Sequence, residues 1–230
     1  RLGRCHRVIG KFIEGSPDSN ARAETAFLRA IELDPRLSIG HRYYAQLQGD
    51  MGETQAALMR LLGEAKRHGN DPELFAGLVH ICRYVGLYDH SLAAHEEARR
   101  LDPNVDTSFE QTLLMKGDTD AILALDDTVK GGGDEGIRII ALGFAGRLDE
   151  ARAALSTRPL VPIPAFQSWN DHLQAWLDRR IDDMILELSS FAGLRIMEDP
   201  EAIFQTGWML CDVGEHERGL SHLRRAIDKG

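Results

Sequence analysis

The chain has 230 residues, of which 43% are hydrophobic and 27% charged, as is ordinary for a globular protein with a substantial core. Its net charge of −9 disfavours nucleic acid as a partner, because an acidic surface repels the phosphate backbone. No stretch approaches the roughly 18 apolar residues that cross a bilayer, and the first residues do not form a signal peptide.

The three cysteines, Cys5, Cys82 and Cys211, lie far apart and form no Cys-x-x-Cys motif. This pattern favours a reducing, cytoplasmic location. The sequence begins without a methionine, so we expect it to be part of a longer chain.

A regular internal repeat marks the first half of the chain. Ala23, Ala57 and Ser91 are evenly spaced, and the interval between them defines one period. Leu33-Asp34-Pro35 returns as Leu101-Asp102-Pro103 after two such periods. A period of about 34 residues is typical of stacked helix pairs.

Each repeat predicts two helices joined at a glycine, such as Gly52 and Gly86, because glycine tolerates the left-handed backbone that ends a helix. A small residue early in the second helix lets two helices approach, and a large residue four positions later fills the space beside it. Asp71-Pro72-Glu73 and Asp199-Pro200-Glu201 predict two helix starts, each with a capping residue, a proline and an acid.

The second half keeps the period less strictly. Gly146–Ala151 and Gly214–Gly219 are similar segments two periods apart, and Arg179–Met184 between them is an off-centre copy. Gly117 divides the shorter gap between Gly86 and Gly146, which predicts two trimmed repeats there.

These residues resemble the tetratricopeptide repeat, a family with the same period, a small-x3-large pattern in the second helix and a closing proline. The matching residues are Ala23, Phe27, Ala30 and Pro35, together with Gly207 and Leu210 in the last unit. The resemblance implies an all-α fold, a right-handed α-solenoid of about seven antiparallel helix pairs. We expect these pairs at roughly 4–35, 38–69, 72–103, 106–131, 134–156, 165–193 and 199–229.

We expect one continuous domain over residues 1–230, with regular repeats at about 4–103 and irregular ones at about 104–230. Short apolar runs such as Ile137–Ile140 lie inside helical periodicity, so no strands are expected. The proline-rich stretch within 157–164 is interpreted as a loop between repeats. Gly131-Gly132-Gly133 is followed by acids rather than by the lysine of a phosphate-binding loop, and predicts a helix stop and a turn.

The resemblance also implies a binding site, because the first helices of such repeats line a concave groove. In the N-terminal half the groove-facing positions are Ile39, Arg42, Tyr43, Gln46, Glu73, His80, Arg83, Tyr84, Glu110 and Leu114. Arginine forks in this set match the carboxylate of an acidic or C-terminal segment; the alternative is a solvated face without a ligand. The family's clamp for chaperone tails needs Lys and Asn where this chain has Val8 and Phe12, so that function is disfavoured.

In the C-terminal half the corresponding positions are Trp169, Leu173, Trp176, Phe204 and Trp208. If they are exposed, these residues form an apolar surface that suits an amphipathic helix. The alternative is that they fill the core.

Catalysis and metal binding have little support. His90 and His95 are five residues apart, and His216 and His222 are six apart, so neither pair shares a helix face. His95 occupies the repeat's large-residue position, which predicts a buried, hydrogen-bonded imidazole. We therefore expect a protein that is not an enzyme, with no catalytic, cofactor-binding or metal-binding residues.

The sequence favours a protein–protein interaction scaffold of a bacterial cytoplasmic protein, which binds a protein or peptide and neither nucleic acid nor membrane. Gly214–Ile227 also resembles the last repeats of bacterial regulators that join such arrays to a kinase, a cyclase or a DNA-binding head. The alternative function is therefore the regulatory or sensor portion of a multidomain enzyme or transcription regulator, whose catalytic or DNA-binding domain is absent from this sequence.

Overall fold

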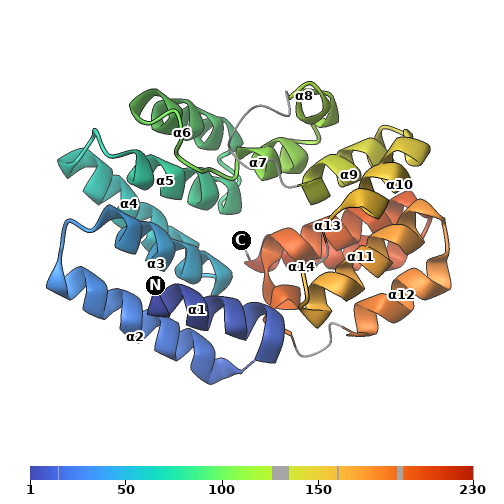
Figure 1. The fold of residues 1–230 in the computed structure, drawn as a ribbon, viewed down its shortest axis with the longest axis horizontal. Coiled ribbons are helices and arrows are strands. Elements are labelled where there is room, and N and C mark those ends of the chain that lie inside the picture. Colours follow the sequence, from blue (N-terminus) through green and yellow to red (C-terminus); the bar gives the residue numbers. More distant parts are fainter. Residues whose placement is uncertain (15, 126–134, 160, 191–193, 230) are drawn as a thin grey trace. The chain divides into compact units, whose positions relative to one another are not determined.

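The computed structural model describes residues 1–230 except 15, 126–134, 160, 191–193 and 230 (Figure 1). Every regular element in the described ranges is a helix, so the predicted all-α class is confirmed. The chain divides into two compact units. Unit 1 contains Arg1–Arg7 and Asp18–Gly133, and unit 2 contains Val8–Pro17 and Asp134–Lys229.

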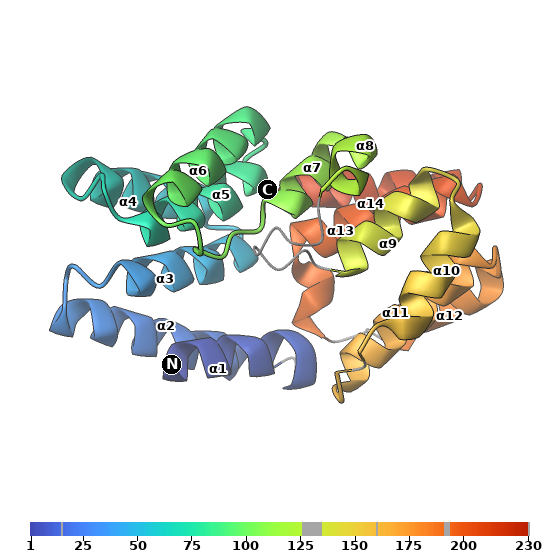
Figure 2. The same cartoon turned by 45° about the horizontal axis from the view of Figure 1, so that its top comes forward.

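Unit 1 consists of consecutive helices, each packed against the next along the chain. They are α2 (Pro17–Leu33), α3 (Ser38–Asp50), α4 (Thr54–Arg67), α5 (Pro72–Tyr84), α6 (Tyr88–Leu101), α7 (Phe109–Lys116) and α8 (Thr119–Leu123). The first helix, α1 (Leu2–Ile9), begins in this unit, where Gly3 lies against the Phe27 ring. Figure 1 and Figure 2 show α3 with α4 and α5 with α6 as antiparallel pairs.

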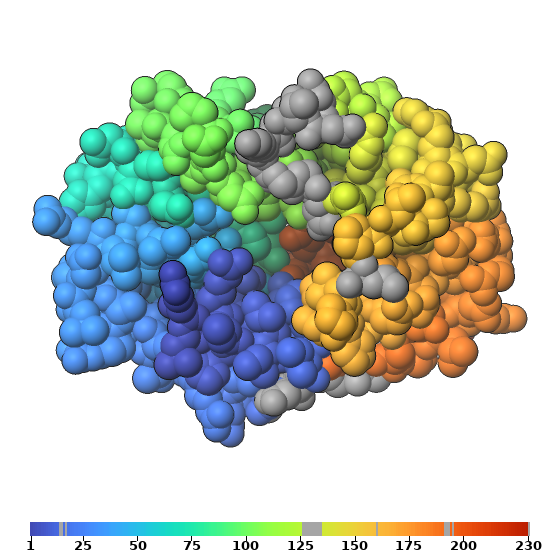
Figure 3. Space-filling view, viewed as in Figure 1, coloured from blue at the N-terminus to red at the C-terminus, as the bar shows by residue number. Residues whose placement is uncertain are grey.

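Unit 2 continues the pairing. Its elements are a π-helical turn η1 (Gly10–Glu14), α9 (Glu135–Phe144), α10 (Leu148–Thr157), α11 (Pro164–Leu177), α12 (Ile181–Ser190), a 3-10 turn η2 (Arg195–Glu198), α13 (Pro200–Asp212) and α14 (His216–Lys229). In Figure 3, α9 to α12 appear as adjacent yellow to orange parts of the surface. The run Ile137–Ile140 lies in α9, as predicted.

The turn inside a helix pair usually closes on a glycine with left-handed backbone. The glycines are Gly52 (φ 82°), Gly86 (72°), Gly117 (76°), Gly146 (74°) and Gly214 (92°). The next residue then donates its N–H back into the first helix, as Leu87 does to the Cys82 carbonyl at 2.8 Å. The predicted role of these glycines is confirmed.

The turn between α11 and α12 has the same geometry without a glycine. Arg179 adopts φ 57°, and Arg180 donates its N–H to the Ala175 carbonyl at 2.9 Å. The irregular repeat segment Arg179–Met184 therefore keeps the same turn. Its non-glycine residue carries the steric cost that a side chain imposes on left-handed backbone.

Five residues after each turn residue, the second helix carries a buried residue that faces its pair. These residues are Ala57, Ser91, Ile122, Ala151, Met184 and Gly219. The predicted small position is thus buried in each described pair, although in two irregular pairs it holds Ile122 and Met184.

The match of Gly207 and Leu210 to the second-helix pattern of the repeat is wrong, because both residues lie in α13, the first helix of the last pair. The small residue of α14 is Gly219. A Cβ atom on Gly219 would lie 2.7 Å from the Gly207 carbonyl oxygen and 2.4 Å from the Cys211 Sγ. Together the two glycines let α13 and α14 approach closely.

Both predicted caps form, since Asp71 accepts the Glu73 N–H at 3.0 Å and Asp199 accepts the Glu201 N–H at 2.8 Å. The proline-rich loop ends one residue earlier than expected, because Pro164 is the first residue of α11, a position where proline is tolerated. Gly131-Gly132-Gly133, the predicted stop and turn, lies outside the described residues.

Candidate partner-binding surfaces

Arg83 of α5, a predicted carboxylate ligand, is bonded inside unit 1. It is 2% exposed and donates from Nη1 to the Ser108 carbonyl (2.9 Å), the Ser108 hydroxyl (3.0 Å) and the Thr112 hydroxyl (3.3 Å). Its Nη2 donates to His80 Nδ1 at 3.1 Å, which fixes the neutral imidazole with its proton on Nε2. This network ties α5 to α7.

Arg42 of α3 also has partners within the unit. Its guanidinium donates to a Glu73 carboxylate oxygen and to the Asp106 carbonyl, both at 2.7 Å. Only 11% of the Arg42 side chain is exposed. An incoming carboxylate would have to displace Glu73, which already supplies the charge that the guanidinium needs.

The other predicted polar-face residues range from half-buried to buried. Tyr43 and Gln46 are half-buried, and Tyr43 accepts a hydrogen bond from Arg4 at 3.2 Å. Tyr84 and Glu110 are buried, and the Tyr84 ring lies 4.4 Å from the ring of His80. Of the predicted apolar positions, Ile39 is exposed and Leu114 is buried. Contacts within unit 1 are thus made by Arg42, Tyr43, His80, Arg83 and Tyr84.

His95 of α6 is hydrogen-bonded as predicted, but it is half-buried rather than buried. The half-buried imidazole bonds through Nδ1 to the Thr107 hydroxyl at 2.7 Å and stacks on Phe109 at 3.9 Å. Burial lowers the pKa of His95 from 6.5 to about 4, with a smaller effect from Arg99. The ring is therefore neutral at neutral pH.

Trp176 of α11 is a core residue of unit 2. It is 1% exposed, and its Nε1 donates to an Asp212 carboxylate oxygen at 2.9 Å. The edge of its ring lies so close to Gly143 that a Cβ there would come within 2.2 Å. Arg179 pairs with the same carboxylate, so the buried indole is held by polar contacts as well as by packing.

Trp208 of α13 lies on a half-buried aromatic surface. Its ring stacks on Phe144 of α9 with centroids 3.8 Å apart, and the Phe204 ring lies 5.8 Å away in a tilted orientation. Phe144 also contacts the buried Trp176 at 5.0 Å. Phe144, Phe204 and Trp208 are each half-buried, and we call them the aromatic surface of unit 2.

The two remaining C-terminal predictions behave differently. Trp169 is half-buried and stacks on His172 at 5.5 Å, whereas Leu173 is fully buried. Phe144, which completes the aromatic surface, was missed by sequence reasoning. It stands two residues before the turn glycine Gly146, and this position alone gives no sign that it meets Trp208.

Unit 2 also has an open pocket of about 420 Å³ that the sequence did not indicate. Its lining residues are Ile185, Leu188, Ser189, Met197, Glu198, Leu210, Arg218, His222 and Arg225. The cationic groups on its rim have partners nearby, since Arg225 donates to the Met197 carbonyl and Arg218 pairs with Glu215.

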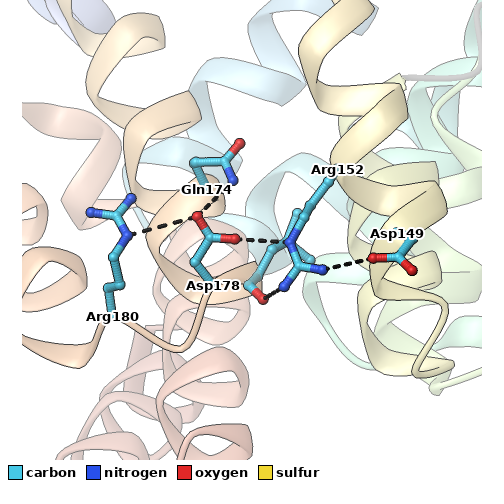
Figure 4. A network of polar contacts seen from close by, with 6 residues as sticks. Asp149, Arg152, Gln174, Asp178 and Arg180 are labelled. Atoms are coloured by element: carbon cyan, nitrogen blue, oxygen red, sulfur yellow. Dashed lines mark hydrogen bonds and ion pairs between the residues drawn. The ribbon is translucent and has the colours of Figure 1, made fainter.

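Figure 4 shows a polar network that joins α10 to the end of α11. Arg152 donates to Asp178 at 2.8 Å, to the Leu177 carbonyl at 2.8 Å and to Asp149 at 3.0 Å. Gln174 also donates to Asp178, and these bonds from Gln174 and Arg152 lower the pKa of the Asp178 carboxyl. The network therefore connects the α9–α10 pair to the α11–α12 pair by hydrogen bonds and ion pairs within the chain.

Within the described ranges, no group of three or more His, Cys, Asp and Glu side chains is placed to hold a metal ion. No helix described here has the length and apolar character needed to span a membrane. The three cysteines are free thiols, and burial raises the pKa of Cys82.

The described helices define an all-α repeat protein built from antiparallel helix pairs. No family model matches the chain, and no curated protein matches it. A similar solved structure is described as "YrrB: a TPR protein with an unusual peptide-binding site". It has 17% sequence identity and a TM-score of 0.40, and the match covers 89% of this chain and 92% of that one.

Proposed function

We propose that the chain is a protein-interaction scaffold, and that the aromatic surface of unit 2 binds an apolar side chain of a partner peptide or helix. The observation that carries this proposal is the half-buried Trp208, stacked on Phe144 and beside Phe204. Tryptophan at a partly exposed position supplies a large, rigid contact area and is enriched among the residues that dominate binding energy.

The indole N–H groups of Trp176 and Trp208, which both contact Phe144, differ in a way that supports this site. Trp176 Nε1 donates to Asp212, whereas Trp208 Nε1 has no acceptor among the described residues. A partner carbonyl is a suitable acceptor for that N–H group. The arginines of unit 1 are weaker candidates, because Arg42 and Arg83 already donate to groups of their own unit.

Helix pairs also provide the rigidity that such a site needs, because a preformed surface loses little conformational freedom on binding. A cytoplasmic location is part of the proposal, and the free thiols of Cys5, Cys82 and Cys211 support it.

The test begins with selection of peptides from a displayed library on the immobilised protein. Isothermal titration then compares the selected peptide on the unmodified protein and on Trp208→Ala. We expect Trp208→Ala to weaken binding at least about tenfold, as for a central interface tryptophan. The matched control is Leu186→Ala, which removes an exposed apolar side chain of the same unit and should leave the affinity unchanged.

A protein that retains only Trp208, with Trp169→Phe and Trp176→Phe, gives an independent signal. Its emission should shift to shorter wavelength and resist acrylamide quenching when the peptide binds. Peptides that bind Trp208→Ala undiminished but lose affinity for Arg42→Ala would move the site to unit 1. Failure to select any binding peptide would overturn the scaffold proposal.

A further inference from the structure

A short segment near the N-terminus, Val8–Pro17, belongs to unit 2, although the rest of that unit begins at Asp134. Its π-helical turn η1 contacts α11 and η2. The segment is therefore attached to unit 2 by contacts alone, since the chain between them runs through unit 1.

Two adjacent side chains of this segment make its described contacts with unit 2. Lys11 forms an ion pair with Asp199, and the two side chains are only 12% and 5% exposed. Phe12 stacks on Phe166 of α11, with ring centroids 4.9 Å apart and planes 27° apart. The Lys11 ammonium also lies 5.8 Å from the centre of the Phe12 ring.

The two oxygens of the Asp199 carboxylate bind different partners. Oδ1 accepts the Glu201 N–H and caps α13, while Oδ2 binds the Lys11 ammonium. Asp71 caps α5 in the same way, but its Oδ2 accepts from a hydroxyl, that of Ser38. The two caps have the same sequence, Asp-Pro-Glu, so the pairing with a lysine is a property of the surface around Asp199.

We infer that Phe166, Asp199 and the adjoining turn η2 form a recognition site for a short segment in which a lysine is followed by an aromatic residue. Lys11 and Phe12 are its resident intramolecular ligand. The carboxylate selects the cation, and the Phe166 ring selects the aromatic side chain. A partner with the same Lys-aromatic pair competes for the site and displaces residues 10–14. The site is separate from the aromatic surface of unit 2 and does not depend on it.

The test uses a labelled peptide with the sequence of residues 8–17 (VIGKFIEGSP), added to the whole protein. In the unmodified protein the resident segment competes, so binding measured by fluorescence anisotropy should be weak. In the double variant Lys11→Ala/Phe12→Ala the site is vacated, and we expect the same peptide to bind at least tenfold more tightly. Peptides with alanine at the lysine or phenylalanine position should not bind.

The paired caps supply matched variants. In the Lys11→Ala/Phe12→Ala background, Asp199→Asn keeps a capping side chain but removes the charge, and should weaken peptide binding at least tenfold. Asp71→Asn makes the same change at the other cap and should leave the binding unchanged. Equal effects at both caps would show a loss of helix structure rather than of recognition, and would overturn the inference.

A second measurement applies even if the double variant does not fold. An excess of the peptide, added to the unmodified protein, should raise the deuterium uptake of residues 8–14 several-fold, because it displaces them. Unchanged uptake at saturating peptide would overturn the inference, as would a double variant that is folded but binds the peptide no better than the unmodified protein.

Discussion

Between its first helices, unit 1 holds hydrogen-bonded polar side chains, whereas unit 2 holds aromatic rings. In unit 1, Arg83 is buried and donates to Ser108, Thr112 and His80. In unit 2, the place between neighbouring first helices is filled by Trp176, which packs against Gly143 and Phe144.

This contrast shows that the same arrangement of helix pairs can be packed with either polar or aromatic side chains between its first helices. A polar interior needs each buried donor and acceptor to find a partner, so it fixes the helices through hydrogen bonds but leaves little for an outside ligand. An aromatic interior is held by contact area, and its outermost rings, such as Trp208, stay half-buried. This is why we propose a partner site in unit 2 rather than in unit 1.

The tryptophans and tyrosines allow the two units to be distinguished by spectroscopy. The three tryptophans, Trp169, Trp176 and Trp208, belong to unit 2, and the four tyrosines, Tyr43, Tyr44, Tyr84 and Tyr88, belong to unit 1. Unfolding of each unit can therefore be followed separately, by tryptophan fluorescence and by tyrosine near-ultraviolet circular dichroism.

The largest effect is expected for Gly219→Ala in unit 2. The added Cβ would meet the Gly207 carbonyl oxygen at 2.7 Å and the Cys211 amide nitrogen at 2.9 Å, and backbone atoms cannot rotate away. We expect a loss of more than about 3 kcal/mol in the free energy of unfolding, measured by urea titration with tryptophan fluorescence.

Gly63→Ala is the matched control in unit 1, because nothing lies within 4 Å of a Cβ there and the residue is inside α4. This variant should gain about 0.5–1 kcal/mol, from the higher helix propensity of alanine. If both substitutions changed stability in the same direction, close approach would not be what distinguishes the α13–α14 pair.

Arg83→Met should give the next largest effect, this time in unit 1. Removing the guanidinium leaves the half-buried Ser108 and the buried Thr112 and His80 without this donor, and we expect a loss of about 3 kcal/mol in the free energy of unfolding. The tyrosine signal should report it. Arg100→Met, at an exposed arginine of α6 paired with Glu97, should leave stability unchanged. Equal, negligible effects would mean that the polar interior does not stabilise unit 1.

The smallest effect concerns pH and unit 2. His172 is fully buried, its Nδ1 bonds to the Met184 carbonyl at 3.0 Å, and burial lowers its pKa from 6.5 to about 4. The unfolded chain binds the proton more readily, so the stability is complete above pH 6.5 and is lost as pH falls towards 4. We expect about 2 kcal/mol to be lost between pH 7 and pH 5.

The check is urea unfolding at both pH values, followed by tryptophan fluorescence. His172→Gln should remove most of this pH dependence. His95→Gln, at a half-buried histidine of unit 1 whose pKa is also about 4, should alter only the tyrosine signal. A pH dependence that is the same in His172→Gln as in the unmodified protein would contradict the assignment.

Sequence reasoning succeeded where a structural feature depends on neighbours along the chain. The glycine turns at Gly52 and Gly86 and the caps at Asp71 and Asp199 were predicted, because each involves only a few consecutive residues. The wrong pattern match at Gly207 has the opposite cause. Its role is a close approach to Gly219 of another helix, which the small-x3-large pattern does not reveal.

The candidate sites were only partly predictable. The register placed Arg83 on the predicted polar face of the groove, and Trp176 and Trp208 on its aromatic face, but did not say which would be buried. Burial depends on the helix that packs opposite, and Trp176 is covered while Trp208, also on a first helix, stays half-buried. Lys11 gave no signal at all, because its partner is 188 residues away.

The sequence by itself therefore determined the helical class, the pairing of helices and the positions of the turns, since repeat spacing, glycine and capping residues act locally. Only the tertiary structure decided which side chains of the first helices form hydrogen bonds inside the protein and which stay half-buried. It also decided that residues 8–17 join unit 2. These outcomes depend on contacts between segments far apart in the chain, and a single sequence records no such contacts.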